Sequence, residues 1–243
     1  MIFRQLFDRE SCTYTYLLGD RAAGQAALVD TVREHVGRDL QLLAELGLAL
    51  VAVVETHVHA DHVTGAGELR KRTGATCYVS RLGGAPCADV PLAPGDVVRV
   101  GAIALHVRAT PGHTAGCVSY LVSEGGAAPD RVLTGDALLI RGCGRTDFQE
   151  GDAGKLWDSV HTQLFSLPDE TLVYPAHDYR GMTVSTIGEE KRSNPRLGGA
   201  GAAGEKVSRE GFVALMAALD LPPPAKIAEA VPANRACGDP LKL

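Results

Sequence analysis

Residues 56–62, Thr-His-Val-His-Ala-Asp-His, place three imidazoles and one carboxylate in a single short segment. The whole chain contains eight histidines, so this concentration argues against a polar loop that arose by chance. Because neutral imidazole and carboxylate suit zinc, iron and similar metals, the segment predicts a metal site. His57 and His59 point to one face of an extended segment. The adjacent Asp61 and His62 point in different directions and could serve a second position.

A strand that ends in a tight loop with histidine or aspartate is a pattern that recurs along the chain. The histidine segment follows residues 48–55, an apolar run that indicates a buried strand. Three more ligand-type residues follow later predicted strands in the same way: His113, Asp136 and His177. This arrangement is typical of a metal site presented at the edge of a sheet.

The rest of the sequence indicates a mixed α/β protein. Apolar runs and β-forming residues predict strands at 2–7, 12–18, 25–29, 48–55, 76–80, 96–100, 103–107, 118–122, 131–136 and 171–174. Apolar periodicity and capping residues predict helices at 31–46, with a capping box at Thr31 and Glu34, and at 65–74, 152–164 and 207–219. We expect loops at 81–95 and 198–204 and a proline-containing tail over about the last twenty residues.

Composition and charge argue against several classes of protein. With 243 residues, 45% of them hydrophobic, the chain can bury a sizeable core. Its net charge of −5 gives no electrostatic footprint for nucleic acid or an anionic membrane, and no apolar stretch has the length of a membrane span. The six cysteines are scattered without a C-x-x-C pair, and the N-terminus lacks the features of a signal peptide. We therefore expect reduced thiols, a cytoplasmic location, and neither nucleic acid nor membrane as a partner.

The ligand-type residues occur in the order found in the metallo-β-lactamase superfamily, which the chain resembles from its first strand to about residue 180. Within it, the sequence is most similar to the persulfide dioxygenase family, which includes the ethylmalonic encephalopathy protein. The segments that carry this similarity are 56–65, 110–114, 134–148, 174–179 and 194–197. The resemblance implies a four-layer αβ/βα sandwich with two mixed β-sheets. We expect one domain over residues 1–243, with a core of 1–180 and a C-terminal helical and loop extension of 181–243.

The resemblance also implies a cofactor and its ligands. One Fe(II) per chain would be held by His57, His113 and Asp136, the two-histidine, one-carboxylate set of non-haem iron oxygenases. Four further residues would support this site or represent a vestigial second metal site: His59, Asp61, His62 and His177. Thr134 and Asp178 are candidates for orienting the ligands or their loops, with core packing an equal alternative for Thr134.

The implied activity is the oxidation of glutathione persulfide with O2 to sulfite and glutathione. Glutathione carries two carboxylates, which arginine can grip through paired hydrogen bonds. Arg145, Tyr179 and Arg196 lie in the matching segments and are therefore candidate glutathione-binding residues. The alternative is ordinary ion pairing, for example between Arg145 and Asp147.

Other functions remain open on the sequence alone. A glyoxalase II-type hydroxyacylglutathione hydrolase with a binuclear metal site would share the fold and glutathione, although residues 144–148 depart from the loop expected there. The charge disfavours a nuclease of the same fold, and the intact ligand set disfavours a metal-binding module without catalysis. Cys143 and Cys117 are expected to be buried small residues rather than redox groups. The resemblance also allows a homodimer.

Overall fold

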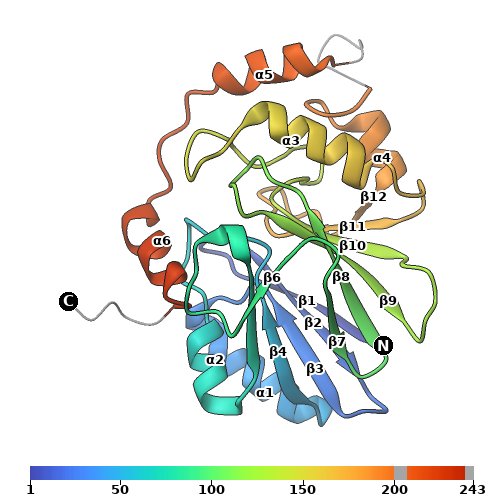
Figure 1. Cartoon of the computed structure of the whole chain (residues 1–243), viewed down its shortest axis with the longest axis vertical. Coiled ribbons are helices and arrows are strands. Elements are labelled where there is room, and N and C mark those ends of the chain that lie inside the picture. Colours follow the sequence, from blue (N-terminus) through green and yellow to red (C-terminus); the bar gives the residue numbers. More distant parts are fainter. Residues whose placement is uncertain (200–206, 239–243) are drawn as a thin grey trace.

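The computed structural model describes residues 1–199 and 207–238, and two facing six-stranded sheets form its framework (Figure 1). The first sheet follows the order of the chain: β1 (Ile2–Phe7), β2 (Tyr14–Asp20), β3 (Gln25–Val29), β4 (Ala49–Val54), β5 (Thr76–Ser80) and β6 (Val90–Leu92). Neighbours are antiparallel from β1 to β3 and parallel from β3 to β6. The sheet is therefore mixed, and the histidine segment follows the end of β4 in its middle.

The second sheet is built from the later part of the chain. Its order is β12 (Ser185–Thr186), β11 (Leu172–Pro175), β10 (Arg131–Gly135), β9 (Val118–Glu124), β8 (Ile103–Ala109) and β7 (Val97–Val100). Only β10 and β11 pair in parallel; the other neighbours are antiparallel. This sheet is also mixed, and its parallel pair sends Asp136 and His177 to one edge.

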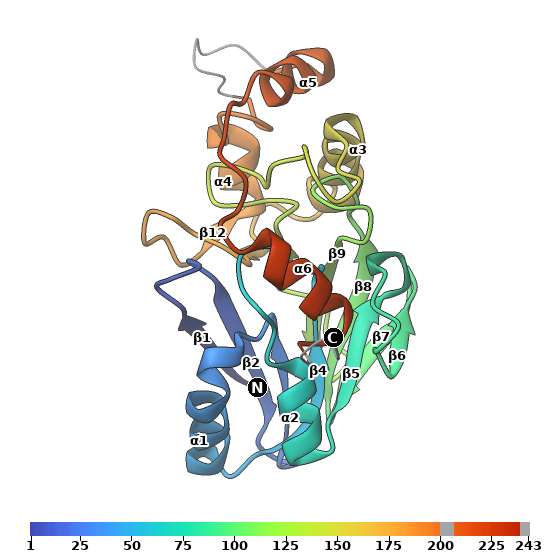
Figure 2. The ribbon, with the colours of Figure 1, turned by 90° about the vertical axis from the view of Figure 1, so that its left-hand side faces the viewer.

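Helices cover the outer face of each sheet and complete four layers (Figures 1 and 2). The first sheet is covered by α1 (Val36–Leu46) and α2 (Ala66–Thr73). The second is covered by α3 (Ala153–Ser159) and α4 (Ile187–Ser193), and α5 (Arg209–Ala217) packs on the outside of α3. A last helix, α6 (Ile227–Arg235), lies between α2 and the α3–α5 layer. The predicted four-layer sandwich with two mixed sheets is confirmed.

Alternation along the strands divides the apolar side chains between the layers. On β2, Tyr16 and Leu18 point between the two sheets, whereas Leu17 packs under the helices of the first sheet. Leu105 and Tyr120 meet the inner face of β2 from the second sheet and are fully buried. The inter-sheet core is therefore a continuous apolar layer beneath the loops that carry the ligand-type residues.

The first helix begins later than predicted. Residues 33–35 form a single 3₁₀ turn and α1 starts at Val36, without a side-chain cap. The capping box predicted at Thr31 is wrong, because its hydroxyl is 3.1 Å from the Thr64 hydroxyl and 3.5 Å from Glu55 instead. The side chain is therefore used inside the fold, near the histidine segment.

Two expectations for the end of the chain are also corrected. The predicted C-terminal tail contains α6, although Pro232 lies inside it. Cys237 follows this helix and forms a disulfide with Cys87, so the expectation that every thiol is reduced is wrong. The two cysteines are 150 residues apart, a separation from which no pairing can be predicted.

Smaller differences concern the predicted loops. The 81–95 loop contributes the short edge strand β6. Most of the loop predicted at 198–204 lies outside the described residues. The division into a 1–180 core and a 181–243 extension stays a prediction. In the part of the chain that the structure describes, no helix is long and apolar enough to cross a membrane.

The inter-sheet core yields a stability prediction. Leu105→Ala is expected to lower the free energy of unfolding by about 2–5 kcal/mol, because it leaves a cavity between two sheets that cannot close over it. Leu82→Ala is the matched control, since Leu82 is 67% exposed, and about 0.5 kcal/mol or less is expected. Denaturant unfolding measures both; equal losses would contradict this description of the core.

Candidate metal centre

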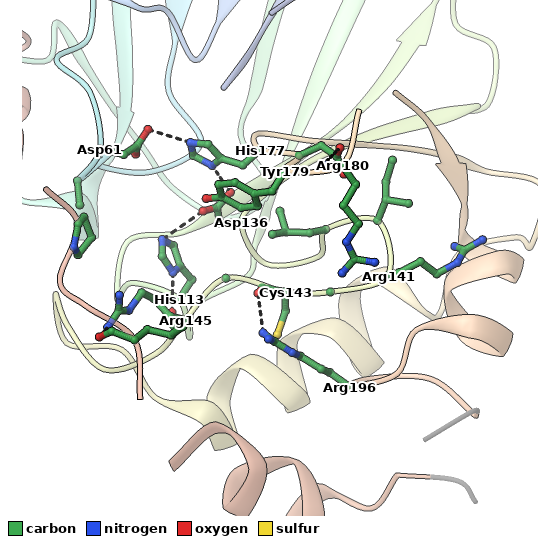
Figure 3. A pocket seen from close by; sticks show the side chains of 18 of the residues that line it. Asp61, His113, Asp136, Arg141, Cys143, Arg145, His177, Tyr179, Arg180 and Arg196 are labelled. Atoms are coloured by element: carbon green, nitrogen blue, oxygen red, sulfur yellow. Dashed lines mark hydrogen bonds and ion pairs between the residues drawn. The ribbon is translucent and has the colours of Figure 1, made fainter. Parts of the chain in front are cut away.

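Four loops that are distant in sequence meet at one edge of the sandwich. His57 follows β4, His113 lies between β8 and β9, Asp136 follows β10, and His177 follows β11. Figure 3 shows His113, Asp136 and His177 together on one side of a pocket. Each of these four side chains is buried. Both sheets therefore contribute to one polar cluster.

The first group of possible ligands consists of His57, His113 and Asp136. One ligand atom from each lies within 4.8 Å of the others. His113 Nε2 is 3.6 Å from Asp136 Oδ2. Burial lowers the pKa of His57 well below its ordinary value, and neighbouring His59 lowers it further, so this imidazole is neutral and can coordinate a metal. The structure thus brings together the three predicted iron ligands.

A hydrogen-bond relay determines which nitrogen of His57 is free. Thr56 Oγ1 donates to the Asp30 carboxylate, at 2.9 Å from Oδ2. A hydroxyl has one proton, so Thr56 Oγ1 must accept its 2.9 Å hydrogen bond from His57 Nδ1–H, which leaves Nε2 unprotonated. His113 is oriented similarly, because its Nδ1–H donates to the carbonyl oxygen of Arg145 at 2.6 Å.

A tight turn after β10 presents Asp136. Gly135 has a φ of +55°, and a Cβ at that position would lie 2.8 Å from Thr56 Oγ1. Thr134 Oγ1 donates to the carbonyl oxygen of Leu138 at 2.6 Å and closes the turn around Asp136. Only glycine fits between the turn and the neighbouring threonine. The hydroxyl of Thr134 thus contacts the turn that carries Asp136, and the supporting role of Thr134 stays a prediction.

The second group consists of His59, Asp61, His62 and His177, which also offer ligand atoms within 4.8 Å of one another. His62 Nδ1 is 2.9 Å from Asp61 Oδ2. His62 Nε2 and His59 Nδ1 are buried without a hydrogen-bond partner. Buried polar atoms without partners are unfavourable, so this group could also accept a cation.

His177 connects the two groups. Its Nδ1–H donates to Asp136 Oδ1 at 2.7 Å and its Nε2 lies 3.0 Å from Asp61 Oδ2. Burial lowers the pKa of His177, but the carboxylates of Asp136 and Asp61 outweigh it and raise the pKa well above its ordinary value. In turn, His177 and His113 hold the pKa of Asp136 below its usual range despite burial. In this arrangement His177 is an imidazolium between two carboxylates.

His59 faces a further pair of buried carboxylates. Its Nε2 is 3.2 Å from Asp30 Oδ1 and 3.7 Å from Glu55 Oε2. Burial and the charge of Asp30 raise the pKa of Glu55 well above its ordinary value. His59 therefore belongs to the second group and also to a further group of possible ligands with Asp30 and Glu55, but not to the group of His57, His113 and Asp136.

The donor set of the first group fits a transition metal. Two neutral imidazoles and one carboxylate are the ligands of non-haem iron sites, and they leave positions open for other molecules. His113 and Asp136 also line the pocket, so those positions are accessible to a substrate. The chain therefore has a site for a metal cofactor.

The pocket next to this site has a volume of about 440 Å³. One part of its wall is apolar and includes Leu139, Phe148 and Leu221. Four arginines also line it: Arg141, Arg145, Arg180 and Arg196. In Figure 3, Asp136 and His177 lie on one side of the pocket and Arg196 lies on the other. The pocket therefore suits an anionic molecule with an apolar portion.

The three predicted glutathione-binding residues all line this pocket. Arg145 is paired with Asp147 at 2.6 Å, the ion pair considered as its alternative role, and also donates to the carbonyl oxygen of Pro222 at 2.6 Å. Arg196 donates to the carbonyl oxygen of Cys143 at 3.3 Å. Tyr179 is 69% exposed and its ring is parallel to that of His177, with centroids 6.2 Å apart.

Sequence reasoning missed two arginines of the pocket. Arg141 forms ion pairs with Glu189 and with the buried Glu190, so its charge is neutralised. Within the described residues, no hydrogen bond or ion pair involves the guanidinium of Arg180, whereas its backbone N–H donates to Asp178 at 2.8 Å. Asp178 thereby fixes the loop that presents Arg180. The short distance in sequence from His177 was the signal that could have identified Arg180.

Asp30 and Thr56 were also missed as supporting residues. Asp30 ends an apolar strand and has a φ of +53°, so it resembles Asp136 in its position after a strand.

Cys143 and Cys117 are buried, as expected. Burial raises the pKa of Cys143 to about 11 and that of Cys117 to about 12, so both are protonated thiols near neutral pH.

The relay to His57 leads to a prediction about metal affinity. Thr56→Val removes the hydroxyl that connects Asp30 to His57 and is expected to weaken metal binding by about 10–100-fold. Thr15→Val is the matched control, because its buried hydroxyl donates to the backbone carbonyl of Asp30 instead. Metal titration of both variants tests the relay, which is wrong if the two affinities change equally.

Comparisons with known proteins agree with this geometry. The model of the metallo-beta-lactamase superfamily matches residues 13–177. The persulfide dioxygenase ETHE1 of Homo sapiens, named as mitochondrial, is 52% identical over 98% of this chain and 89% of its own length. A hydroxyacylglutathione hydrolase of Cereibacter sphaeroides is 36% identical over 77% of this chain and 71% of its own length.

A solved structure is similar over nearly the whole chain. The crystal structure of ETHE1 from Myxococcus xanthus has 58% sequence identity and a TM-score of 0.91, and the match covers 98% of this chain and 100% of that one. This structural match extends into the C-terminal part of the chain beyond residue 177, where the match to the superfamily model ends. The chain belongs to the metallo-β-lactamase superfamily and, within it, to the persulfide dioxygenase family.

Proposed function

We propose that this chain is an Fe(II)-dependent persulfide dioxygenase that oxidises glutathione persulfide with O2 to sulfite and glutathione. The observation that carries the proposal is the group formed by His57, His113 and Asp136, whose ligand atoms all lie within 4.8 Å of one another. The 52% identity to a persulfide dioxygenase supports the same reaction. One iron per chain is part of the proposal.

The pocket supports glutathione as the carrier of the persulfide. In this proposal the unpaired guanidinium of Arg180 binds one glutathione carboxylate, with Arg196 as the candidate for the other. Tyr179 and Phe148 line the same pocket and would exclude water from the terminal sulfur. Arg145 orients His113 through its backbone carbonyl, while its side chain holds the 221–222 segment at the pocket.

The proposed reaction is balanced by one O2 and one water for each persulfide. Both atoms of O2 go to the terminal sulfur, and water cleaves the S–S bond, which releases sulfite and glutathione. When bound, Fe(II) supplies the open positions and the redox chemistry that dioxygen requires. His177 keeps its proton between Asp136 and Asp61 and so holds the Asp136 carboxylate in position.

One observation favours the alternative, a glyoxalase II-type hydrolase with a binuclear site. The second group has two buried ring nitrogens, His59 Nδ1 and His62 Nε2, without hydrogen-bond partners. Against it, His177 already uses both nitrogens on carboxylates, and a cation in the second group would have to compete with its proton. A homodimer and a cytoplasmic location remain predictions.

Metal content and substrate choice distinguish the two reactions. Anaerobically loaded protein is expected to hold one iron per chain and to consume O2 on addition of glutathione persulfide, with about one sulfite formed per O2. His113→Ala should lose both iron and oxygen uptake, whereas His106→Ala should retain them, because His106 bonds Ser123 within the second sheet. Two metals per chain with cleavage of S-lactoylglutathione and no oxygen uptake would overturn the proposal.

Arg180 gives a prediction about substrate binding. Arg180→Gln is expected to raise the KM for glutathione persulfide by about 10–100-fold with little change in kcat, because it removes a charge-assisted hydrogen bond distant from the reacting sulfur. Arg209→Gln serves as the control, since Arg209 pairs with Asp158 on the surface. Steady-state oxygen uptake measures both variants. An unchanged KM in Arg180→Gln would remove this residue from the substrate site.

A further inference from the structure

Helix α6 contacts the metal-binding segment through one buried amide. Asn234 Nδ2 donates to the carbonyl oxygens of His59 at 2.9 Å and His62 at 2.8 Å. Asn234 Oδ1 accepts from the backbone N–H of Thr64 at 2.8 Å. The side chain is 5% exposed, so all of these bonds are shielded from water. One residue of helix α6 thus binds two carbonyl groups of the histidine segment and the N–H of Thr64 just after it.

These bonds determine the backbone path of the histidine segment. Residues 57–62 have no regular secondary structure, so their carbonyl groups receive no bonds from a sheet or helix. The Asn234 amide replaces those bonds at the positions of His59 and His62. The same segment carries His57, and a shift of its backbone moves that imidazole relative to His113 and Asp136 on other loops.

Few other contacts hold α6 in place. Within residues 1–199 and 207–238, its cluster of buried apolar residues contains only Val63, Ala230 and Ala233. Its ion pairs, including Arg33–Glu229, have exposed carboxylates and contribute little. A nine-residue helix with an internal proline is not stable by itself.

The Cys87–Cys237 disulfide anchors the end of this helix. It connects the segment after α6 to the loop before β6, across 150 residues of sequence. The carbonyl oxygen of Cys237 also accepts from the N–H of Gly67 in α2 at 2.7 Å. Cys237 is buried, whereas Cys87 is half-buried. A covalent bond thus compensates for the small apolar contact of α6.

We propose that Asn234 is a positioning residue of the metal site and that the Cys87–Cys237 disulfide holds it there, so that metal binding responds to thiols. A low-molecular-weight thiolate attacks the Cys87 sulfur and releases the Cys237 thiolate. A second thiol then displaces Cys87 from the mixed disulfide, which leaves two protein thiols and one oxidised thiol dimer. The inference concerns metal affinity and does not depend on which reaction the metal serves.

To test Asn234, the full chain is titrated with Co²⁺, and binding is measured by the visible absorption of the bound ion. Asn234→Ala is expected to weaken binding by about 10–100-fold and to change the spectrum, because the ligands lose their fixed positions. Asn234→Asp keeps an acceptor for Thr64 but lacks both donor bonds, so it should not restore binding. Leu105→Ala is the control for lost stability, and Glu229→Gln is the control on α6. Unchanged Co²⁺ affinity and spectrum in Asn234→Ala would overturn the proposal.

The role of the disulfide is tested by reduction with glutathione or dithiothreitol, followed by anaerobic removal of the reductant. The reduced protein should show two additional thiols per chain and weaker Co²⁺ binding, in the same direction as Asn234→Ala. The double variant Cys87→Ser/Cys237→Ser should bind Co²⁺ as weakly as the reduced protein, and reduction should not change it further. The same affinity before and after reduction, or no gain in thiols, would disprove thiol control.

Discussion

The burial of several imidazoles and carboxylates at one edge of the sandwich is the constraint on which the rest of the structure depends. A buried charge is unfavourable unless hydrogen bonds or an opposite charge compensate for it. The buried carboxylate of Asp30 accepts hydrogen bonds from Thr56, and that of Asp136 accepts one from His177. Each bond also fixes an imidazole tautomer or a backbone position. The arrangement that makes burial acceptable is therefore the one that prepares the ligands for a metal.

This constraint explains why loops from both sheets converge. No single loop carries enough partners for its own polar groups: His57 depends on Asp30 from the end of β3, and His113 depends on a carbonyl after β10. The apolar layer between the sheets holds these loops at fixed distances. The metal site is thus a product of the whole sandwich rather than of the histidine motif.

The sequence predicted the ligand-type residues because their types are rare and their spacing is regular. It also predicted the architecture, through a resemblance that depends on those residues. It could not reveal the relay through Thr56, since a buried threonine next to histidine has no signature of its own. Helix α6 was not predicted, because Pro232 lies inside it and its apolar face is short. Arg180 was missed because an isolated arginine shows its significance only when its neighbours leave it unpaired.

The superfamily model matches residues 13–177, whereas the pocket is also lined by Arg196, Leu221 and Pro222. The metal ligands therefore all lie within the superfamily match, whereas part of the pocket wall lies beyond it. An exchange of the later stretch between homologues would alter what the pocket admits while every ligand stays in place. In such a superfamily, new substrate specificities can arise by replacement of the C-terminal part. The ligand motifs by themselves therefore identify the chemistry of an enzyme better than they identify its substrate.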